Sequence, residues 1–514
     1  MPLDETLQQE KYAVLRRVFG YDSFRPGQEE VADQLLAGGD VLAVMPTGAG
    51  KSICYQLPAL LLPGVAVVVS PLISLMQDQV QALVQMGVRA AYINSSLSEA
   101  QCRKALANAA AGVYKIVYAA PERLMSPSFL WFARQVRISL LCVDEAHCVS
   151  HWGQDFRPSY LQVAQFTAQL PQRPPVGAFT ATATARVKAD VRQLLELREP
   201  LEVATGFDRP NLYFEVQRLE ERQKYGALRL YLSSQRGRPG IVYCSTRKKA
   251  DEVYARLRED GWAAARYHAG LEAGERQRSQ DDFLYDRVQV MVATNAFGMG
   301  IDKPNVGFVV HYNMPLDLES YYQEAGRAGR DGQPADCILL YAPGDVRTAN
   351  FLIDQGDAPD GAGEAETAAL REAQRGRLRQ MTFYCHSRYC LRGELLRYFG
   401  QRRGPGGCGN CSVCRPEAQK ALPAPPPSAR RAAAHSALED PSLDAGSVRR
   451  LKALRLALAK RAGLPAFVIF TDATLRELAV RRPATQAELM RVPGLGMRKC
   501  ELYGAAILQA LQQE

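Results

Sequence analysis

The segment 45–52, MPTGAGKS, combines residue types that bind the phosphates of a nucleotide. It follows the apolar run 41–45, which is typical of a buried strand, and a helical pattern comes after it. A glycine-rich turn at such a place lets backbone N–H groups surround phosphate oxygens. We therefore expect Thr47, Gly48 and Gly50 to line a phosphate-binding loop.

Two side chains at the end of this segment complete the pattern. Lys51 would neutralise the β- and γ-phosphates, and the Ser52 hydroxyl would bind Mg²⁺. The full phosphate-loop pattern has glycine where this chain has Met45, and short matches of this kind also arise by chance. The position directly after a strand favours the nucleotide-binding interpretation.

A pair of acidic residues, Asp144 and Glu145, follows another apolar run at 139–143. Hydrolysis of a γ-phosphate needs one carboxylate in the Mg²⁺ shell and a second that orients or deprotonates the attacking water. Asp144 fits the first role and Glu145 the second. The alternative is a solvated acidic loop, which the phosphate-binding segment makes the weaker interpretation.

Two arginines, Arg327 and Arg330, lie three residues apart in the segment 320–332. That spacing is one turn of a helix, so both can project into one cleft. Phosphoryl transfer needs positive charge where negative charge develops. We expect Arg330 to be the arginine finger and Arg327 to assist it; the alternative is two solvated arginines on a helix face.

Cysteines are concentrated near the start of the last third of the chain. Cys408, Cys411 and Cys414 are each separated by two residues, and Cys390 precedes them on a predicted helix. Four such thiolates can form the closed tetrahedral site of a structural Zn²⁺. Cys385 is a competing first ligand, and an iron–sulfur cluster is the alternative occupant. Six further cysteines lie singly in or near apolar segments and are expected to be buried thiols: Cys54, Cys102, Cys142, Cys148, Cys244 and Cys337.

The elements that carry these residues form two series of short apolar runs alternating with helical patterns. Continuous Val/Ile/Leu runs separated by amphipathic helices predict parallel sheets covered on both faces, hence two α/β domains with a cleft between them. The first series comprises 41–45, 65–70, 115–120, 139–145 and 176–182, and the second comprises 240–245, 288–294, 306–312 and 336–341.

Composition and length set the wider frame. The chain has 514 residues, 47% hydrophobic and 23% charged, which predicts a soluble protein of several domains. A net charge of +9 favours a polyanionic partner such as nucleic acid. No apolar run is long enough to cross a membrane and the start does not resemble a signal peptide, so we expect a cytoplasmic protein.

Long motifs in a fixed order resemble those of RecQ helicases of superfamily 2. The resemblance covers nearly all of residues 10–415. It rests on FGYDSFRPGQ (19–28), MPTGAGKS (45–52), VVVSPLISLMQDQV (67–80), YAAPERL (118–124), DEAHCVSHWGQDFRPSY (144–160), FTATAT (179–184), GFDRPNL (206–212), GIVYCSTR (240–247), YHAGL (267–271), VATNAFGMGIDKPNV (292–306) and SYYQEAGRAGRDG (320–332).

This resemblance assigns further residues of the nucleotide site. It implies that Tyr21, Arg25 and Gln28 hold the adenine, which would make ATP the preferred nucleotide. A ring can stack on the base while an amide pairs with its edge; the alternative for Tyr21 is a core aromatic. From the second domain, Gly300 and Asp302, with Gly298, are expected to line the cleft.

The resemblance also implies a loop that senses single-stranded DNA. Trp152 and Phe156 would offer flat faces to bases, and Arg157 would offer charge to a phosphate or to the nucleotide site. Family members usually have histidine where this chain has Gln154, so coupling between DNA binding and hydrolysis is expected to differ. Thr180 and Thr182 resemble the motif that links hydrolysis to domain movement.

The C-terminal third resembles two further family modules. The cysteine segment matches the RecQ zinc-binding segment, which favours Cys390 over Cys385 as a Zn²⁺ ligand. The last domain resembles HRDC, and its PGLG turn (493–496) is either a phosphate-binding turn or a helix connection. Candidate phosphate contacts there are Arg449, Arg450 and Lys499.

The predicted architecture is two tandem RecA-like parallel-sheet domains, a helical zinc-binding module and an all-α HRDC-like domain. Family members usually carry a winged helix before HRDC, whereas only a proline-rich linker stands there in this chain. The predicted divisions are 1–206 (ATP-binding domain), 207–345 (second RecA-like domain), 346–416 (zinc module), 417–445 (linker) and 446–514 (HRDC-like domain).

The resemblance implies an ATP-dependent 3′-to-5′ helicase that moves on single-stranded DNA and unwinds forked or tailed duplexes in repair or recombination. It would use ATP, Mg²⁺ and Zn²⁺, act as a monomer near the nucleoid, and admit partners such as single-strand-binding protein. Three alternatives stay open. One is a DNA-stimulated translocase that unwinds weakly because the winged helix is absent, and another is an RNA helicase. The third is a DNA-binding scaffold without catalysis, which the intact Lys51, Asp144 and Glu145 disfavour.

Overall fold

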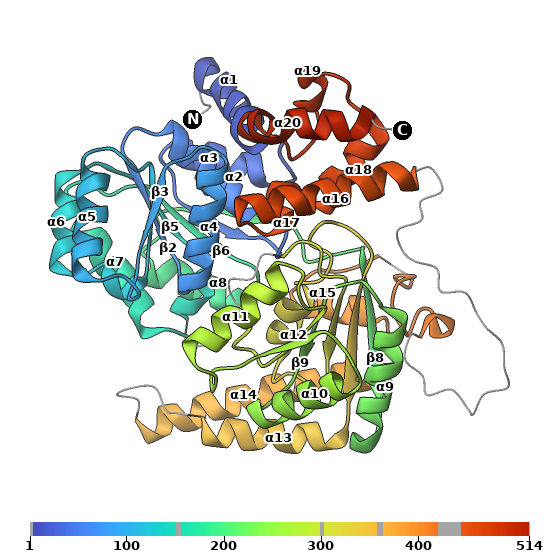
Figure 1. Ribbon diagram of the computed structural model, residues 1–514. Coiled ribbons are helices and arrows are strands. Elements are labelled where there is room, and N and C mark those ends of the chain that lie inside the picture. The colour runs from blue at the N-terminus through green and yellow to red at the C-terminus, as the bar shows by residue number, and fades with distance from the viewer. Residues whose placement is uncertain are drawn as a thin grey trace.

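The computed structural model describes residues 4–150, 156–298, 303–356, 363–404, 406–419 and 444–512. Two α/β lobes lie one above the other in Figure 1, and the C-terminal helices lie beside the first lobe, across from the second. The predicted pair of RecA-like domains is confirmed, because each lobe is built on a parallel sheet.

The first lobe contains a seven-stranded parallel sheet with the order β3-β4-β2-β5-β6-β1-β7. Its strands are β1 (Val41–Val44), β2 (Val65–Val69), β3 (Ala90–Ile93), β4 (Ile116–Ala119), β5 (Ile138–Val143), β6 (Val176–Thr180) and β7 (Leu201–Ala204). Its helices are α1 (Glu5–Val14), η1 (Leu15–Phe19), α2 (Gln28–Leu36), α3 (Lys51–Leu61), α4 (Ile73–Gln85), α5 (Glu99–Ala110), η2 (Pro121–Arg123), α6 (Pro127–Gln135), η3 (Ala146–Val149), η4 (Pro158–Leu161), α7 (Gln162–Ala168) and α8 (Ala185–Leu194).

The second lobe contains a six-stranded parallel sheet with the order β10-β11-β9-β12-β13-β8. Its strands are β8 (Leu212–Arg218), β9 (Gly240–Tyr243), β10 (Ala264–Tyr267), β11 (Val290–Ala293), β12 (Phe308–His311) and β13 (Ala335–Tyr341). Its helices are α9 (Glu221–Ser234), α10 (Arg247–Glu259), α11 (Ala273–Leu284) and α12 (Leu318–Ala325). The central strands are fully buried because helices cover both faces of the sheet.

A helical module follows the second lobe and packs on it. It consists of α13 (Pro343–Gln355), α14 (Glu364–His386), α15 (Leu391–Tyr398) and η5 (Pro416–Ala418). Phe399, just after α15, stacks on Phe207 with ring centroids 4.4 Å apart. Arg392 of α15 pairs with Asp208 at 2.7 Å, so the module is fixed to the segment that joins the two lobes.

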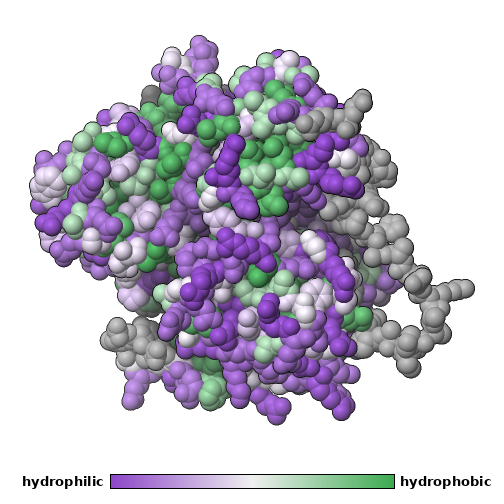
Figure 2. All heavy atoms as spheres, in the orientation of Figure 1, coloured by the Kyte–Doolittle hydropathy of each residue, from purple (hydrophilic) through white to green (hydrophobic). Residues whose placement is uncertain are grey.

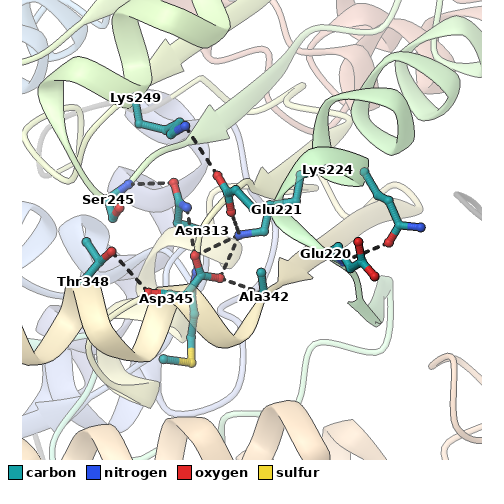
Figure 3. Close-up of polar contacts among 12 residues, drawn as sticks. Glu220, Glu221, Lys224, Ser245, Lys249, Asn313, Ala342, Asp345 and Thr348 are labelled. Carbon is teal, nitrogen blue, oxygen red and sulfur yellow. Dashed lines mark hydrogen bonds and ion pairs between the residues drawn. The ribbon is translucent and has the colours of Figure 1, made fainter.

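A buried ion pair fixes the start of α13 to the second lobe (Figure 3). Lys224 of α9 lies 2.8 Å from Asp345, and both side chains are almost fully excluded from solvent. Asn313 donates to the same carboxylate at 2.9 Å, and the backbone N–H of Ala342 donates at 3.0 Å. These donors compensate for burying the charged Asp345, which would otherwise be costly.

The C-terminal helices form a small domain with its own core. They are α16 (Ala445–Ala462), α17 (Ala466–Ile469), α18 (Asp472–Arg481), α19 (Gln486–Leu489) and α20 (Met497–Gln512). Buried side chains such as Leu451, Phe470 and Ile507 fill its centre. Figure 1 shows α20 beside α1, so this domain packs next to the first helices of the chain.

The surface is mixed on the face shown in Figure 2. Hydrophobic residues gather over the C-terminal helices and the first lobe, whereas the second lobe is mostly hydrophilic there. Among the described helices, none combines the length and the apolar character that crossing a bilayer requires.

Candidate nucleotide site and zinc centre

A cavity of about 850 Å³ lies between the two lobes at the carboxyl ends of β1 and β5. Parallel sheets place ligands at this edge because the loops that follow the strands converge there. Its lining includes the phosphate-binding segment, both acidic residues and both arginines. The structure therefore brings together the side chains that were singled out from separate motifs.

The phosphate-binding segment turns sharply between β1 and α3. Gly48 and Gly50 have φ of +83° and +82°, a backbone conformation that favours glycine. Lys51 is the first residue of α3, and its Nζ donates to the carbonyl of Met45 at 3.1 Å. Ser52 lines the same cavity. The segment thus presents a helix N-terminus and an ammonium group to a phosphate chain.

The residues expected to hold adenine lie beside this loop. Tyr21 and Arg25 line the cavity, and Arg25 donates to the carbonyl of Gly48 at 2.7 Å. Gln28 is almost fully buried and donates to the carbonyls of Ala49 at 2.9 Å and Gly50 at 3.1 Å. In this structure Gln28 therefore stabilises the phosphate-binding loop, and its amide nitrogen is already hydrogen-bonded to that loop.

Asp144 and Glu145 emerge from the end of β5. The backbone N–H of Asp144 donates to Val69 at 2.9 Å, which extends the sheet pairing to the acidic residue. Glu145 has φ of +50°, unusual for a residue with a side chain. Burial raises the pKa of Asp144 to about 7, the charge of Glu145 adds to the rise, and Lys51 opposes it. A bound cation would favour the ionised carboxylate.

A chain of polar contacts leads away from the acidic pair. His147 Nδ1 lies 3.4 Å from a Glu145 carboxylate oxygen and 2.9 Å from the Thr180 hydroxyl. Thr180 in turn donates to the carbonyl of Thr182 at 2.9 Å. His147, Thr180 and Thr182 are all buried. The contacts connect the acidic pair at the carboxyl end of β5 with the loop after β6.

Both arginines lie in the turn that follows α12. The predicted helical spacing is wrong, because α12 ends at Ala325 and the residues from Gly326 onward form turns. A Cβ atom built on Gly48 would lie 3.5 Å from Arg330 Cγ, so Arg330 faces the phosphate-binding loop. Arg327 is almost fully buried. The two side chains still line the same cavity.

Arg209 is a cavity residue that the motif analysis did not single out. Its guanidinium donates to the carbonyls of Thr47 at 2.8 Å and Gly329 at 2.7 Å, so it connects the two lobes. Burial lowers its pKa from the usual value. The Thr47 hydroxyl donates to Gly326 at 3.0 Å and adds a second contact between the lobes. The sequence signal that could have identified Arg209 is the motif GFDRPNL (206–212), in which Arg209 is the middle residue.

Four cysteines converge beside α15. The sulfur atoms of Cys390, Cys408, Cys411 and Cys414 all lie within 4.8 Å of one another. Four thiolates at this spacing fit a structural Zn²⁺ ion and leave no open coordination position. Cys385 is buried near the end of α14 and does not belong to the group.

The isolated cysteines behave as the sequence predicts. Burial is complete or nearly so for Cys54, Cys102, Cys142, Cys148, Cys244 and Cys337. Burial also raises the pKa of the Cys54 thiol to about 12, so it is inert as a nucleophile.

Only part of the DNA-sensing loop lies within the described residues. Phe156 and Arg157 are half-buried, and Arg157 donates to the carbonyl of Pro71 at 2.8 Å. Trp152 and Gln154 lie outside the described residues, as do Gly300 and Asp302 of the second lobe. Gly298 lies close to Arg327, since a Cβ built on it would be 3.3 Å from a guanidinium nitrogen.

The candidate DNA contacts of the C-terminal domain differ in exposure. Arg449 is exposed. Arg450 donates to the carbonyl of Ala510 at 3.3 Å within the domain. Lys499 is partly buried, and burial lowers its pKa to about 8. The PGLG turn is not free to receive a phosphate here, because the N–H of Gly494 donates to Gly20 at 3.0 Å.

Comparison with known families agrees with this arrangement. Residues 25–191 match the DEAD/DEAH box helicase family, and residues 223–332 match the helicase conserved C-terminal domain. Residues 343–415 match the RecQ zinc-binding family, and residues 444–511 match the HRDC domain. The ATP-dependent DNA helicase RecQ of Bacillus subtilis (strain 168) is 36% identical, with 97% of this chain and 98% of the relative covered. The chain belongs to the RecQ family of helicases.

A second RecQ relative extends over the same length. The ATP-dependent DNA helicase RecQ of Pasteurella multocida (strain Pm70) is 33% identical, covering 99% of this chain and 94% of the relative. The predicted RecQ resemblance is therefore confirmed, and with it the zinc-binding and HRDC modules.

Solved structures share the fold of this RecQ-family chain. Saccharomyces cerevisiae Dbp5 bound to RNA and ADP BeF3 aligns with a TM-score of 0.53 at 18% identity, covering 72% of this chain and 98% of Dbp5. The DUF1998 helicase MrfA bound to DNA aligns with a TM-score of 0.54 at 20% identity, covering 66% and 52% of the two chains.

Proposed function

We propose that this RecQ-family protein is an ATP-dependent DNA helicase that moves 3′ to 5′ on single-stranded DNA and separates forked or tailed duplexes. The observation that carries the proposal is the cavity in which Lys51, Glu145 and Arg330 meet from two lobes. A nucleotide held there contacts both lobes at once, so its hydrolysis can change their separation. The RecQ relatives named above favour DNA as the strand.

ATP binding would use the first lobe. The backbone amides after Gly48 and the Lys51 ammonium would bind the phosphates, while Tyr21 and Arg25 would flank the base. Mg²⁺, held by Ser52 and Asp144, would neutralise phosphate charge.

Hydrolysis would use residues from both sides of the cavity. Glu145 would orient and deprotonate the attacking water. Arg330 would stabilise the charge that develops on the γ-phosphate, with Arg327 beside it. Arg209 would hold the lobes in the arrangement that brings Arg330 to the phosphate-binding loop, since it bonds Thr47 and Gly329 together.

Hydrolysis would be coupled to movement through the buried contacts of His147. Loss of the γ-phosphate changes the charge around Glu145, and His147 connects Glu145 with Thr180. The lobes would then separate and close again with each ATP, with alternating grip on one strand. Trp152, Phe156 and Arg157 are the proposed contacts to that strand in the first lobe.

The remaining modules would hold the duplex. We propose that Zn²⁺ stabilises the helical module, so that its arginines can face DNA, and that Arg449, Arg450 and Lys499 provide weaker contacts from the HRDC domain. The proposed division of labour follows residues 1–206 and 207–345 for the motor, 346–416 for the zinc module, 417–445 for the linker and 446–514 for HRDC. A role in DNA repair or recombination fits such a substrate.

A second candidate is a DNA-stimulated translocase with weak unwinding. The matched zinc-binding and HRDC regions end and begin at residues 415 and 444, which leaves little chain between them. The alignment with the B. subtilis relative spans 589 positions, more than the 514 residues of this chain. The relative thus has residues without counterpart here, and strand separation would rest on the remaining modules.

Unwinding of matched substrates tests the proposal and separates it from the alternatives. Forked, 3′-tailed and 5′-tailed duplexes of DNA and of RNA are compared at one salt concentration, because affinity for nucleic acid depends strongly on salt. We expect ATP-dependent opening of the forked and 3′-tailed DNA. Opening of 5′-tailed DNA alone would refute the direction, and opening of RNA alone would refute the substrate. Rapid hydrolysis without opening would favour the translocase.

A further inference from the structure

The HRDC domain docks on both lobes of the motor. On the first lobe, Gly494 donates its N–H to the carbonyl of Gly20 at 3.0 Å. On the second lobe, the hydroxyl of Tyr285 donates to the carbonyl of Gly463 at 2.9 Å. Figure 1 shows the C-terminal helices beside α1 and facing the second lobe. The domain therefore bridges the two lobes.

The contact with the first lobe is a close approach of two backbones. A Cβ atom built on Gly496 would lie 2.6 Å from the carbonyl oxygen of Val18. A Cβ atom built on Gly20 would lie 2.6 Å from the nitrogen of Gly496. Such distances leave no space for a side chain, so the PGLG turn fits this lobe because both residues are glycines.

The docked domain forms part of the wall of the nucleotide cavity. It contributes seven lining residues, which share the cavity with Lys51 and Arg330: Thr471, Ala473, Thr474, Arg476, Glu477, Pro493 and Gly494. Four of the seven lie on α18, which presents its first two turns to the cavity. A nucleotide in this cavity would therefore be within reach of the HRDC domain as well as of the two lobes.

Arg476 is the positively charged member of this wall. Its Nη1 atom is shielded from solvent and has no hydrogen-bond partner among the described residues. Its charge acts on Asp331, which directly follows Arg330 in the second lobe. A buried guanidinium nitrogen without a partner is costly, and an oxygen-rich ligand would remove that cost.

We propose that Arg476 is a nucleotide-binding residue and that the HRDC domain forms the third wall of the ATP site. The proposal rests on the proposed function, because it takes the cavity to be the ATP site. The guanidinium would donate to an oxygen of the bound nucleotide from the side opposite the phosphate-binding loop. A cation in a cavity shielded from water attracts an anionic ligand more strongly than one in bulk solvent.

Equilibrium binding of a fluorescent ADP and of a non-hydrolysable ATP analogue, without DNA, tests the proposal on the full chain. We expect Arg476→Ala to weaken binding about ten-fold, which is typical for loss of one hydrogen bond to a charged group. Arg476→Lys should lose less. Arg461→Ala is the matched control, because Arg461 is an exposed arginine of the same domain outside the cavity. Thermal melting would show that each variant is folded.

Gly496→Ala tests the docked arrangement by a second route. Gly496 does not have positive φ, so alanine suits the turn itself and conflicts with the first lobe, at the carbonyls of Val18 and Arg17. We expect the domain to move away, visible by small-angle scattering, and nucleotide affinity to fall as in Arg476→Ala. The double variant should lose no more than either single variant, since both remove the same interaction.

The outcomes separate this inference from the proposed function. Wild-type affinity in Arg476→Ala would overturn the inference, and so would a displaced domain in Gly496→Ala with affinity retained. In either case DNA-stimulated hydrolysis by the wild-type chain would leave the proposed motor standing. Failure of the wild-type chain to bind either nucleotide would overturn both.

Discussion

Glu145 combines an unfavourable backbone conformation with a carboxylate that lies at the nucleotide cavity. Its backbone adopts a left-handed conformation that costs about 1 kcal/mol or more for a residue with a side chain. The same conformation keeps the carboxylate next to both the cavity and His147. Strain of this kind persists where the surrounding structure fixes it, here through the pairing of Asp144 with Val69. Its position favours Glu145 as the residue that activates water.

Glu145→Gln should abolish DNA-stimulated ATP hydrolysis and preserve nucleotide binding. The amide cannot accept the proton of the attacking water, whereas the Lys51 ammonium and the backbone amides of the loop are unchanged. Turnover and equilibrium binding of an ATP analogue are measured on the same preparation. Lys51→Ala is the counterpart that should weaken binding itself. Normal turnover by Glu145→Gln would show that another group activates the water.

Arg330→Ala should lower the turnover number about 10³-fold and leave nucleotide affinity nearly unchanged, because an arginine finger acts mainly on the transition state. Steady-state hydrolysis with saturating oligonucleotide gives the turnover number. A variant that loses affinity and keeps turnover would assign Arg330 to ground-state binding.

Glu319 predicts a pH dependence of stability. Burial raises its pKa to about 7, and the charge of Asp317 adds to the rise. The folded chain therefore holds this proton more tightly than the unfolded chain, so the stabilisation is complete below the ordinary pKa of about 4.5 and is lost as pH rises through about 7. At pH 8, Glu319→Gln should have a higher melting temperature than wild type. We expect its free energy of unfolding to be larger by on the order of 1 to 3 kcal/mol.

The control for this prediction is Glu372→Gln, which changes an exposed glutamate of α14. Melting temperatures of the three proteins are compared at pH 5 and pH 8. The gain of Glu319→Gln should shrink at pH 5, where the carboxyl is protonated. An equal gain at both pH values would mean that packing, and not the charge, is responsible.

At the scale of elements, the sequence predicts the central strands of each sheet but not the edge strands. The strands absent from the predicted series are β3, β7, β8 and β10, and these are the outermost strands of the two sheets. Edge strands have one unpaired side and mix polar with apolar residues, so they lack the continuous apolar runs of central strands.

The positions of the phosphate-binding segment and of the acidic pair can be predicted, because both follow central strands. Lys51 and Asp144 follow β1 and β5, which read as apolar runs. Arg209 was missed because it lies between the lobes, and its role depends on contacts with Thr47 and Gly329 that are far away in sequence. The docking of PGLG on Gly20 was missed for the same reason.

The cysteine cluster makes a prediction about one metal ion. Purified protein should carry about one Zn²⁺ per chain, and Cys408→Ser should lose it, because tetrahedral sites need all four ligands. The matched control is Cys385→Ser, which changes a buried cysteine outside the cluster. Elemental analysis measures the metal, and melting should show destabilisation on its loss. Equal zinc loss in Cys385→Ser would contradict the assignment.

The ion pair between Lys224 and Asp345 supports the start of α13. Asp345→Ala should destabilise the chain by about 3 to 5 kcal/mol, since it leaves the buried Lys224 with only the half-exposed Glu221, 3.3 Å away, as a carboxylate partner. Asp22→Ala is the control, because Asp22 is exposed and pairs with Arg16 on the surface. The midpoint of chemical unfolding gives both effects. A small effect of Asp345→Ala would mean that water reaches Lys224.

At the scale of the whole molecule, three bodies surround one cavity. The lobes supply the phosphate-binding loop and the arginines, and the HRDC domain contributes part of the cavity wall. Charge agrees with this use, because a chain with a net charge of +9 attracts both ATP and a nucleic acid strand. The lobes are bonded through Arg209 and Thr47, so the described arrangement is a closed one.

The central claim is that a strand of DNA and the nucleotide cavity act on each other through the two lobes. The most direct measurement is the rate of ATP hydrolysis with and without a single-stranded oligonucleotide, for the wild-type chain and for Lys51→Ala. We predict at least a ten-fold rise with the oligonucleotide for wild type and no measurable hydrolysis for the variant. Equal rates of wild type with and without the oligonucleotide would contradict the account.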